Sequence, residues 1–336
     1  MSKKLSLLLI LTLLSTLTAS AQTFINSIYY YLDKKKGEAQ VSSVPVGLPR
    51  YSGGVSIPEK FEHEGVEYKV TSIMSSAFCG CSDLGTVTIP DGVTEIGKNT
   101  FKDCPKLTIV NIPNNVTVIN GNAFYGCSSL NPLPNLSGVT LIEGGAFYGC
   151  SSLKEANIPG GVTIINGGTF YNCSALEYVN IPNNVTVING NAFYGCSSLE
   201  SIEIPINVEN IGDHAFAYCS KLKNVFCYPL SPPQASPSTF EKVDLANATL
   251  HVPPGYEASY MEVEPWKSFG LIVPIIHGDS NGDGIVDMKD TKTIANARLG
   301  TEHATKVADV NKDGVVSMPD IMFTINYIKN GKFPDE

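Results

Sequence analysis

Two short stretches near the carboxyl end gather oxygen-bearing residues at the spacing of a calcium-binding loop. Oxygen ligands at loop positions 1, 3, 5, 9 and 12, a backbone carbonyl at position 7 and glycine at position 6 suit a hard cation. The first loop supplies Asp279, Asn281, Asp283, the carbonyl of Ile285, Asp287 and Asp290. The second loop, 30 residues later, supplies Asp309, Asn311, Asp313, the carbonyl of Val315, Ser317 and Asp320. The sequence therefore predicts two bound calcium ions (Ca2+).

Residues 276–336, which contain both loops, resemble a type I dockerin. The likeness rests on the duplication, on aspartate rather than glutamate at position 12, and on the lack of a helix-length segment before the first loop. It implies a small all-α calcium-binding domain that attaches to a protein partner, a cohesin. Family partner choice is associated with positions 10 and 11, which here hold Met288, Lys289, Met318 and Pro319, and Thr291 replaces an expected leucine. The alternative is a calcium-stabilised tail without a partner.

No pattern in the chain points to catalysis. The histidines lack metal-ligand spacing: His63, His214, His251, His277 and His303. Gly278-Asp279-Ser280 is similar to an esterase nucleophile motif, but it lies inside the first loop, where Asp279 already serves as a ligand. The G-x-S-x-G and phosphate-loop motifs do not occur. We therefore predict a protein that is not an enzyme, with no catalytic residues.

The rest of the chain is organised by a repeat of 23 residues. Residues 111–130, NIPNNVTVINGNAFYGCSSL, recur unchanged at 180–199. One position is always phenylalanine: Phe78, Phe101, Phe124, Phe147, Phe170, Phe193 and Phe216. Three residues later comes a cysteine: Cys81, Cys104, Cys127, Cys150, Cys173, Cys196 and Cys219. A fixed period of this length predicts a solenoid, because one unit cannot bury its own apolar face.

Each coil has an internal order of elements. Residues 107–112 are expected to form a short strand, which Pro113 ends because proline offers no N–H to a sheet. Residues 116–119 form a second short extended piece. Gly121 is expected to turn the chain with a positive φ. Residues 123–127 have the apolar spacing of one helical turn that faces the core.

The pattern LxxVxIPxxVTxIxGxAFxxC resembles the BspA-like leucine-rich repeats of secreted bacterial proteins, over residues 50–275. The resemblance implies a repeat solenoid of mainly short parallel β-strands with helical turns. It also implies adhesion-type, carbohydrate-binding or protein-binding roles. One coil departs from the pattern, with Pro132, Pro134 and Asn135-Leu136 where others have Ile-Pro. We expect a local break in strand pairing there.

The nine cysteines pose a choice between disulfides and free thiols. An exported chain with this many cysteines usually forms disulfides. Seven of them, however, share one repeat position, so their side chains should point the same way into the core rather than toward one another. Buried cysteine packs as a small hydrophobe. We expect a ladder of free thiols, and the states of Cys79 and Cys227 stay open.

Two rows of residues should face solvent and could bind a ligand. Alternation along the strands places one row outward: Thr86, Thr88, Ile109, Asn111, Pro132, Pro134, Glu155, Asn157, Tyr178, Asn180, Ser201, Glu203, Asn224 and Phe226. This row is either a binding face or a solvated sheet. The second row is Tyr125, Tyr148, Tyr171 and Tyr194. These rings either stack on sugars or stack on one another between coils.

The amino end reads as a secretory signal over residues 1–21. Lys3 and Lys4 precede an apolar run, residues 5–17, that is shorter than a membrane span. Cleavage is predicted after Ala21, and Gln22 is not the cysteine of a lipoprotein. No later segment is apolar enough to span a bilayer. The protein is therefore expected to be secreted or associated with the bacterial cell surface.

Three further segments complete the domain organisation. Residues 22–69 should form an N-terminal β cap, with a strand at 28–32 and a hairpin over 61–68. Residues 70–275 should form the solenoid, its carboxyl end closed by Trp266 and Phe269. Residues 276–336 are the dockerin-like module. The net charge of −9 and the lack of a basic stripe argue against a nucleic-acid partner.

The sequence thus predicts a secreted, non-catalytic binding or adhesion solenoid that attaches through a calcium-dependent dockerin to a cohesin-type partner or an extracellular assembly. A glycan or a host protein is the expected class of ligand for the solenoid. The alternative is an enzyme or an enzyme inhibitor delivered to a polysaccharide-degrading complex.

Overall fold

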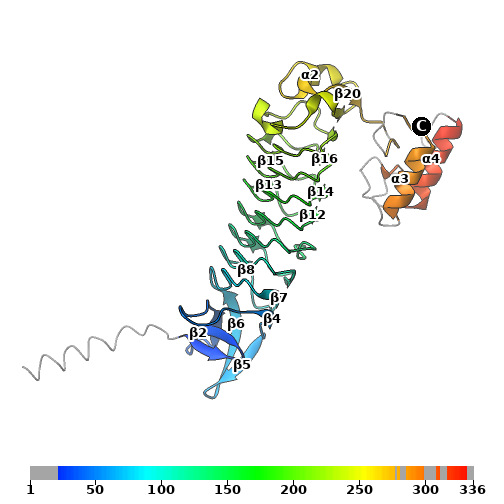
Figure 1. The fold of residues 1–336 in the computed structure, drawn as a ribbon. Helices are drawn as coiled ribbons and strands as arrows, with labels where there is room; N and C mark the ends of the chain where they lie inside the picture. Colours follow the sequence, from blue (N-terminus) through cyan, green and yellow to red (C-terminus); the bar gives the residue numbers. More distant parts are fainter. Residues whose placement is uncertain (1–21, 277, 281–284, 299–307, 311–315, 331–336) are drawn as a thin grey trace, which may run out of the picture.

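The computed structural model describes residues 22–276, 278–280, 285–298, 308–310 and 316–330. It has an elongated solenoid with a β-sheet cap at its amino end and a helical pair after its carboxyl end (Figure 1). The predicted fold class, a repeat solenoid of short parallel strands followed by a small α-helical domain, is confirmed. The predicted signal segment, residues 1–21, lies outside the described residues.

The N-terminal cap is a five-stranded sheet with the order β1-β2-β3-β6-β5. Its strands are β1 (Thr23–Ile25), β2 (Ile28–Asp33), β3 (Glu38–Val41), β5 (Lys60–His63) and β6 (Val66–Ile73). The strand predicted at 28–32 and the hairpin predicted over 61–68 are both present. Tyr30 is fully buried beside Phe61, with ring centroids 4.7 Å apart, so the sheet covers the core at this end.

One face of the solenoid is built from the first strand of each coil, and all of these strands run parallel. They are β4 (Gly53–Ser56), β7 (Leu84–Thr88), β9 (Ile109–Asn111), β12 (Glu155–Asn157), β14 (Tyr178–Asn180), β16 (Ser201–Ile204), β18 (Asn224–Cys227), β19 (Thr249–Val252) and β20 (Leu271–Pro274). In the part of the chain that the structure describes, the coil between those of β9 and β12 contributes no strand to this face. The predicted break is therefore confirmed at Pro132 and Pro134, which cannot donate to a sheet.

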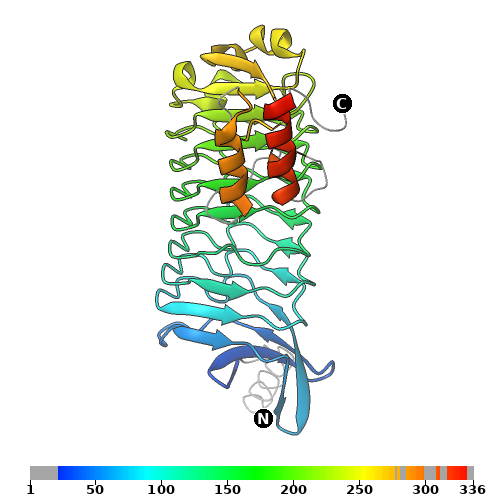
Figure 2. The same cartoon turned by 90° about the vertical axis from the view of Figure 1, so that its right-hand side faces the viewer.

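A second face is built from two-residue strands, one in each coil. They are β8 (Glu95–Ile96), β10 (Val118–Ile119), β11 (Leu141–Ile142), β13 (Ile164–Ile165), β15 (Val187–Ile188) and β17 (Asn210–Ile211). They pair in parallel in two sheets, β8-β10-β11 and β13-β15-β17. Figure 2 shows the strands of successive coils stacked along the solenoid. The second extended piece predicted in each coil is present.

The core between these faces is a column of phenylalanine rings. The seven repeat phenylalanines are fully buried. Their ring centroids, continued by Phe240, lie 5.2–5.6 Å apart along the column. Burying each ring is worth about 1.5–3 kcal/mol. Because each ring contacts one above and one below, the coils stabilise one another rather than themselves.

The turn after the second strand combines local and inter-coil hydrogen bonds. Tyr125 N donates to Asn122 O (3.1 Å) and Cys127 N donates to Phe124 O (3.1 Å), both of the i→i−3 type. Between them, Gly126 N donates to Tyr148 O of the next coil (2.7 Å), as Phe124 N does to Ala146 O (2.8 Å). The helical turn predicted at 123–127 therefore stays one tight turn, because alternate N–H groups are used by the neighbouring coil.

The glycine of this turn has a different role from the predicted one. The positive φ expected at Gly121 lies instead at Asn122 (φ 56°) and Gly126 (φ 72°). A Cβ at Gly144, the equivalent of Gly121 in the next coil, would lie only 3.0 Å from Gly167 O. Glycine is required there because successive backbones approach closely, not because the chain turns.

All nine cysteines lie within the described residues and are free. Six repeat thiols donate to the carbonyl of the phenylalanine one coil earlier: Cys104, Cys127, Cys150, Cys173, Cys196 and Cys219, at Sγ–O distances of 3.0–3.3 Å. Burial raises the pKa of Cys173 to about 12 and holds the pKa of Cys150 well above its ordinary value. The predicted thiol ladder is confirmed, and each thiol is also a hydrogen-bond donor between coils.

Native protein is expected to react slowly with a thiol reagent at every cysteine except Cys79, the only one that is not buried. A raised pKa and burial both suppress the reactive thiolate. Absorbance of the released thiolate dye should show one fast thiol in native protein and nine after denaturation without reductant. Cys79→Ala is the matched control, because it should remove the fast phase alone. Finding most of the ladder oxidised in denatured, unreduced protein would contradict this.

The carboxyl end of the solenoid is closed by short helical segments. They are η1 (Pro237–Phe240), η2 (Leu245–Asn247), α2 (Glu257–Met261) and η3 (Trp266–Ser268). Trp266 is fully buried, lies edge-on to Phe240 at 5.8 Å, and donates from Nε1 to Pro233 O (3.0 Å). With Phe269 also buried, the predicted plug at this end is confirmed.

Two longer helices, α3 (Met288–Arg298) and α4 (Met318–Asn330), follow the two predicted calcium loops. Each begins at loop position 10. In the described part of the chain, no helix is long and apolar enough to cross a membrane.

Candidate calcium site and binding surfaces

Seven of the twelve predicted calcium ligands lie within the described residues: Asp279, Ile285, Asp287, Asp290, Asp309, Ser317 and Asp320. The other five lie outside them: Asn281, Asp283, Asn311, Asp313 and Val315. Among the described residues, no three His, Cys, Asp or Glu side chains come together as a metal-binding group. Positions 3 and 5 of both loops are outside this part of the chain.

The two loops enter their helices with the same hydrogen bond. In the first loop, Asp287 N donates to Asp290 Oδ2 (2.8 Å). In the second, Ser317 N donates to Asp320 Oδ2 (2.7 Å). The position 12 carboxylate thus lies in the first helical turn and accepts the N–H at position 9, as in a capping box. The structure therefore repeats the local geometry at both loops, as the duplicated sequence predicts.

The burial and chemistry of these residues fit a hard cation. Asp279, Asp290 and Asp320 are buried. Burying a carboxylate is costly unless it is hydrogen-bonded or paired with a cation. The donor set is made only of oxygens, which calcium prefers. Buried acids at the start of each helix are therefore where a calcium ion would be held.

The other sequence motifs considered for catalysis have structural roles. Ser280 is buried, and its Oγ donates to Asp290 O (2.9 Å), so this hydroxyl supports the first loop rather than serving as a nucleophile. His214 Nε2 lies 3.1 Å from Glu241 Oε2 in a partly exposed pair. Burial lowers the pKa of His251 to about 4, which keeps this ring neutral in the core. His63 lies in β5, and His277 and His303 are outside the described residues.

The structure describes part of the core of the helical domain. Ile294, Ala308 and Val310 are buried, and Val316 and Ile321 pack against them. Thr291 replaces the expected leucine and is buried, with its Oγ1 donating to Met288 O (2.8 Å).

Exposed apolar side chains lie at the start of each helix. Met288 and Met318, which occupy position 10 of the two loops, are 60% and 45% exposed. Met322, one turn after Met318 in α4, is also exposed. Methionine is a flexible, polarisable side chain that suits a protein-binding surface. These residues form a candidate partner surface.

The outward row of the solenoid is mostly as predicted. Ile109 in β9 and Asn180 in β14 are exposed. Two members of the row are instead buried. Pro134 is buried in the coil that lacks a strand. Phe226 stacks on His251 of the next strand at 4.2 Å, and His251 Nε2 lies 3.1 Å from Asn224 Oδ1.

The tyrosine row forms a continuous stack. The centroids of Tyr125, Tyr148, Tyr171 and Tyr194 lie 4.4–4.5 Å apart, with rings inclined by 4–14°. Lys102 Nζ lies 4.7 Å from the centroid of the Tyr125 ring. The faces of the inner rings are therefore covered by one another. The alternative in which these tyrosines stack between coils is confirmed, and a sugar cannot stack on the inner rings.

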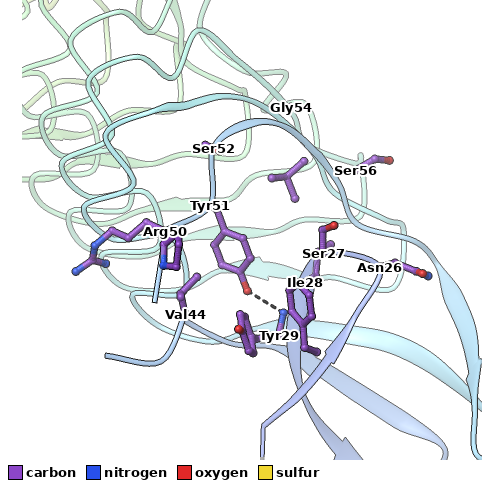
Figure 3. A pocket seen from close by; sticks show the side chains of 13 residues that line it. Asn26, Ser27, Ile28, Tyr29, Val44, Arg50, Tyr51, Ser52, Gly54 and Ser56 are labelled. Carbon is purple, nitrogen blue, oxygen red and sulfur yellow. Dashed lines mark hydrogen bonds between the residues drawn. The ribbon is translucent and has the colours of Figure 1, made fainter. Parts of the chain in front are cut away.

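One surface was not identified from the sequence. A hollow of about 600 Å³ lies between the β1–β2 hairpin and β4 (Figure 3). The sequence signal for this surface is the Gly53-Gly54 pair in a strand without charged residues. Natural edge strands usually carry a charge or proline, so a strand without either indicates an open edge.

Comparisons with known proteins match two separate regions of the chain. A family model of the BspA type leucine rich repeat region matches residues 60–167 and 140–252. A family model of the dockerin type I domain matches residues 277–329. No curated protein is significantly similar to the chain.

Solved structures of bacterial repeat proteins are similar to the solenoid. A leucine rich cell surface protein from Faecalibacterium prausnitzii A2-165 has 26% identity and a TM-score of 0.54, over 75% of this chain and 72% of that one. A leucine-rich repeat protein from Bacteroides ovatus ATCC 8483 has 25% identity and a TM-score of 0.54, over 75% and 76%. The leucine rich repeat protein of T. pallidum has 25% identity and a TM-score of 0.50, over 60% and 91%.

The two repeat matches together span residues 60–252 of the 336-residue chain, which is more than half of it. The strands, the phenylalanine column and the two helices described above agree with these matches. The protein therefore belongs to the BspA type leucine-rich repeat family and carries a type I dockerin domain at its carboxyl end.

Proposed function

We propose that this protein is a secreted, non-catalytic binding or adhesion solenoid that attaches through its calcium-dependent dockerin to a cohesin-type partner or an extracellular assembly. The observation that carries the proposal is the dockerin domain joined to a repeat solenoid. The solenoid offers long exposed faces, and the dockerin offers a separate point of attachment. In this arrangement the solenoid binds a ligand, which is a glycan or a host protein, while the dockerin fixes its location.

Two calcium ions would organise the dockerin. In the proposed first site the ligands are Asp279, Asn281, Asp283, the carbonyl of Ile285, Asp287 and Asp290. In the proposed second site they are Asp309, Asn311, Asp313, the carbonyl of Val315, Ser317 and Asp320. A bound ion neutralises the acids of each loop. The chain's own contribution is the hydrogen bond from position 9 to the position 12 carboxylate, which holds each loop against its helix.

The domain limits and location are part of the same proposal. Residues 1–21 are a signal peptide that is removed, 22–69 the N-terminal cap, 70–275 the solenoid and 276–336 the dockerin. Export agrees with the dockerin and with the repeat family, whose members are typically extracellular or surface-associated. The free thiols do not oppose export, because burial protects them from oxidants.

Replacing Met288 and Met318 together by serine is expected to weaken binding to a type I cohesin at least about tenfold, since buried apolar contacts dominate protein interfaces. A panel of purified type I cohesin domains is the probe, with affinity measured by calorimetry on the full chain in calcium. Met261→Ser is the matched control, because Met261 is similarly exposed (52%) but lies in the solenoid cap. Failure of every cohesin to bind in calcium, or binding that persists in EDTA, would contradict the proposed attachment.

A further inference from the structure

The solenoid's amino end has an open strand edge beside the hollow of Figure 3. Strand β4 begins the sheet β4-β7-β9 and pairs only with β7 among the described strands. The cap sheet covers the core but does not pair with β4, since its strands form a separate sheet. The first strand of the solenoid therefore has one paired edge and one edge without a strand beside it.

The backbone groups on the open edge can be identified from the bonds on the paired edge. Gly53 N donates to Asp83 O (2.8 Å) and Ile57 N donates to Thr88 O (3.0 Å), both toward β7. Alternate residues of a parallel strand direct their backbone groups to opposite sides. The N–H and C=O of Gly54 and Ser56 therefore face away from β7. Within the described residues, the N–H groups of Gly54 and Ser56 donate no hydrogen bond outside the β4–β7 pairing.

The sequence of β4 does nothing to block this edge. The strand reads Gly-Gly-Val-Ser, without lysine, proline or an inward charge, which are the usual means of preventing edge pairing. No atom lies within 4 Å of the place where a Cβ on Gly53 would stand. An approaching backbone therefore meets neither a bulky side chain nor a charge on this strand.

The hollow beside the edge has room for a strand, and its lining combines polar groups with aromatic and aliphatic side chains. It measures about 600 Å³ and is lined by β4 on one side and by the β1–β2 hairpin on the other. Phe24 is 58% exposed, and its ring centroid lies 4.6 Å from that of Tyr29. Val44 and Val55 add aliphatic surface, and Arg50 is the only charged residue of the lining.

Two internal hydrogen bonds keep the hollow's floor fixed. Tyr29 N donates to Tyr51 Oη (2.9 Å), as drawn in Figure 3, and Tyr51 Oη donates to Ser42 O (2.8 Å). Burial raises the pKa of Tyr51 to about 12, so its hydroxyl keeps this proton at neutral pH. The hairpin is therefore held at a set position relative to the chain that leads into β4.

We propose that this edge and hollow bind an extended peptide segment of a partner protein, which adds as a strand to β4. An unpaired backbone edge recognises another extended backbone, and alternate side chains of that strand enter the hollow. This peptide site is separate from the proposed attachment through the dockerin. It rests on the proposed binding role of the solenoid and assigns to that role a class of partner. The experiment must distinguish the peptide from two other occupants, a glycan and a second copy of this chain.

The probe is the fluorescein-labelled, end-blocked peptide LGTVTIP, a copy of residues 84–90, whose parent strand already pairs with β4. Fluorescence anisotropy with the full chain is expected to show saturable binding. Ser56→Pro removes an outward N–H without removing a donor to β7, and should weaken binding at least about tenfold. Ser56→Ala keeps the N–H and is expected to bind as the unchanged protein does.

Two modified peptides keep the test valid even where Ser56→Pro disturbs folding. Methylating the backbone nitrogens of alternate residues blocks one edge of the peptide, and methylating the other alternate set blocks the opposite edge. One of the two methylated peptides should not bind, and the other should bind with an affinity within about twofold of the parent peptide, because only one edge of the peptide faces β4.

Several results would overturn the peptide site. They are no binding of the parent peptide, equal binding of both methylated peptides, or a chain dimer that Ser56→Pro dissociates in sedimentation experiments. Binding of xylohexaose that Ser56→Pro leaves unchanged, without peptide binding, would assign the hollow to carbohydrate instead. Loss of the peptide site with calcium-dependent cohesin binding retained would leave the proposed attachment intact.

Discussion

Removing calcium with EDTA is expected to unfold α3 and α4 and to leave the solenoid folded. Without the ion, the acids of each loop repel one another, and a domain of about 60 residues has little core to oppose this. The helices have 11 and 13 residues, whereas α2 has only five, so circular dichroism at the helical band reports on this domain. The helical signal should fall to near the level of the solenoid alone and return when calcium is added.

The number of ions can be tested on the same protein. Titration calorimetry is expected to give two ions, and Asp290→Asn or Asp320→Asn should each remove one, because both side chains are buried and are the predicted ligands at position 12. Asp283→Ala and Asp313→Ala, outside the described residues, are expected to do the same. Asp244→Asn, an exposed acid in the solenoid, is the matched control. A stoichiometry near zero, or circular dichroism unaffected by EDTA, would mean that calcium does not organise this domain.

Phe147→Ala is expected to lower the free energy of unfolding of the solenoid by about 3–5 kcal/mol. The ring is fully buried between Phe124 at 5.3 Å and Phe170 at 5.6 Å, so its removal leaves a cavity that rigid coils cannot close. Urea denaturation is the measurement. Fluorescence of Trp266, the single tryptophan, reports unfolding because the residue is buried in the solenoid's own cap.

The matched control for this change is Phe24→Ala, which removes the same ring from an exposed position. Its effect should stay within about 1 kcal/mol, since little apolar area is buried there. Comparable losses for both changes, or a loss below about 1 kcal/mol for Phe147→Ala, would show that the phenylalanine column does not dominate solenoid stability.

Much of the solenoid could be predicted from the sequence because its determinants are local and periodic. The 23-residue spacing of Phe124, Cys127 and their equivalents fixes which side chains enter the core. Pro132 and Pro134 indicate where strand pairing stops. The calcium loops are equally local, so their place at the starts of α3 and α4 agrees with the spacing, while their ligands stay a prediction.

Some features were placed wrongly because neighbouring coils decide them. Gly121 was expected to have a positive φ, which Asn122 adopts instead, and the close approach of the adjacent backbone is found at the equivalent Gly144. Pro134 and Phe226 were expected to face solvent by strand alternation. Phe226 is covered by His251 of the next strand, and Pro134 lies where no strand forms to impose the alternation.

By itself, then, the sequence determined the repeat, the inward residues and the free thiols, since each follows from residue type at a fixed spacing. Only the tertiary structure decided which residues of different coils contact one another and which strands of different sheets remain unpaired. The thiol of Cys150 donates to Phe124 O, 26 residues earlier. The open edge of β4 exists because the cap forms a separate sheet. Both depend on distances between segments, which no local pattern of side chains specifies.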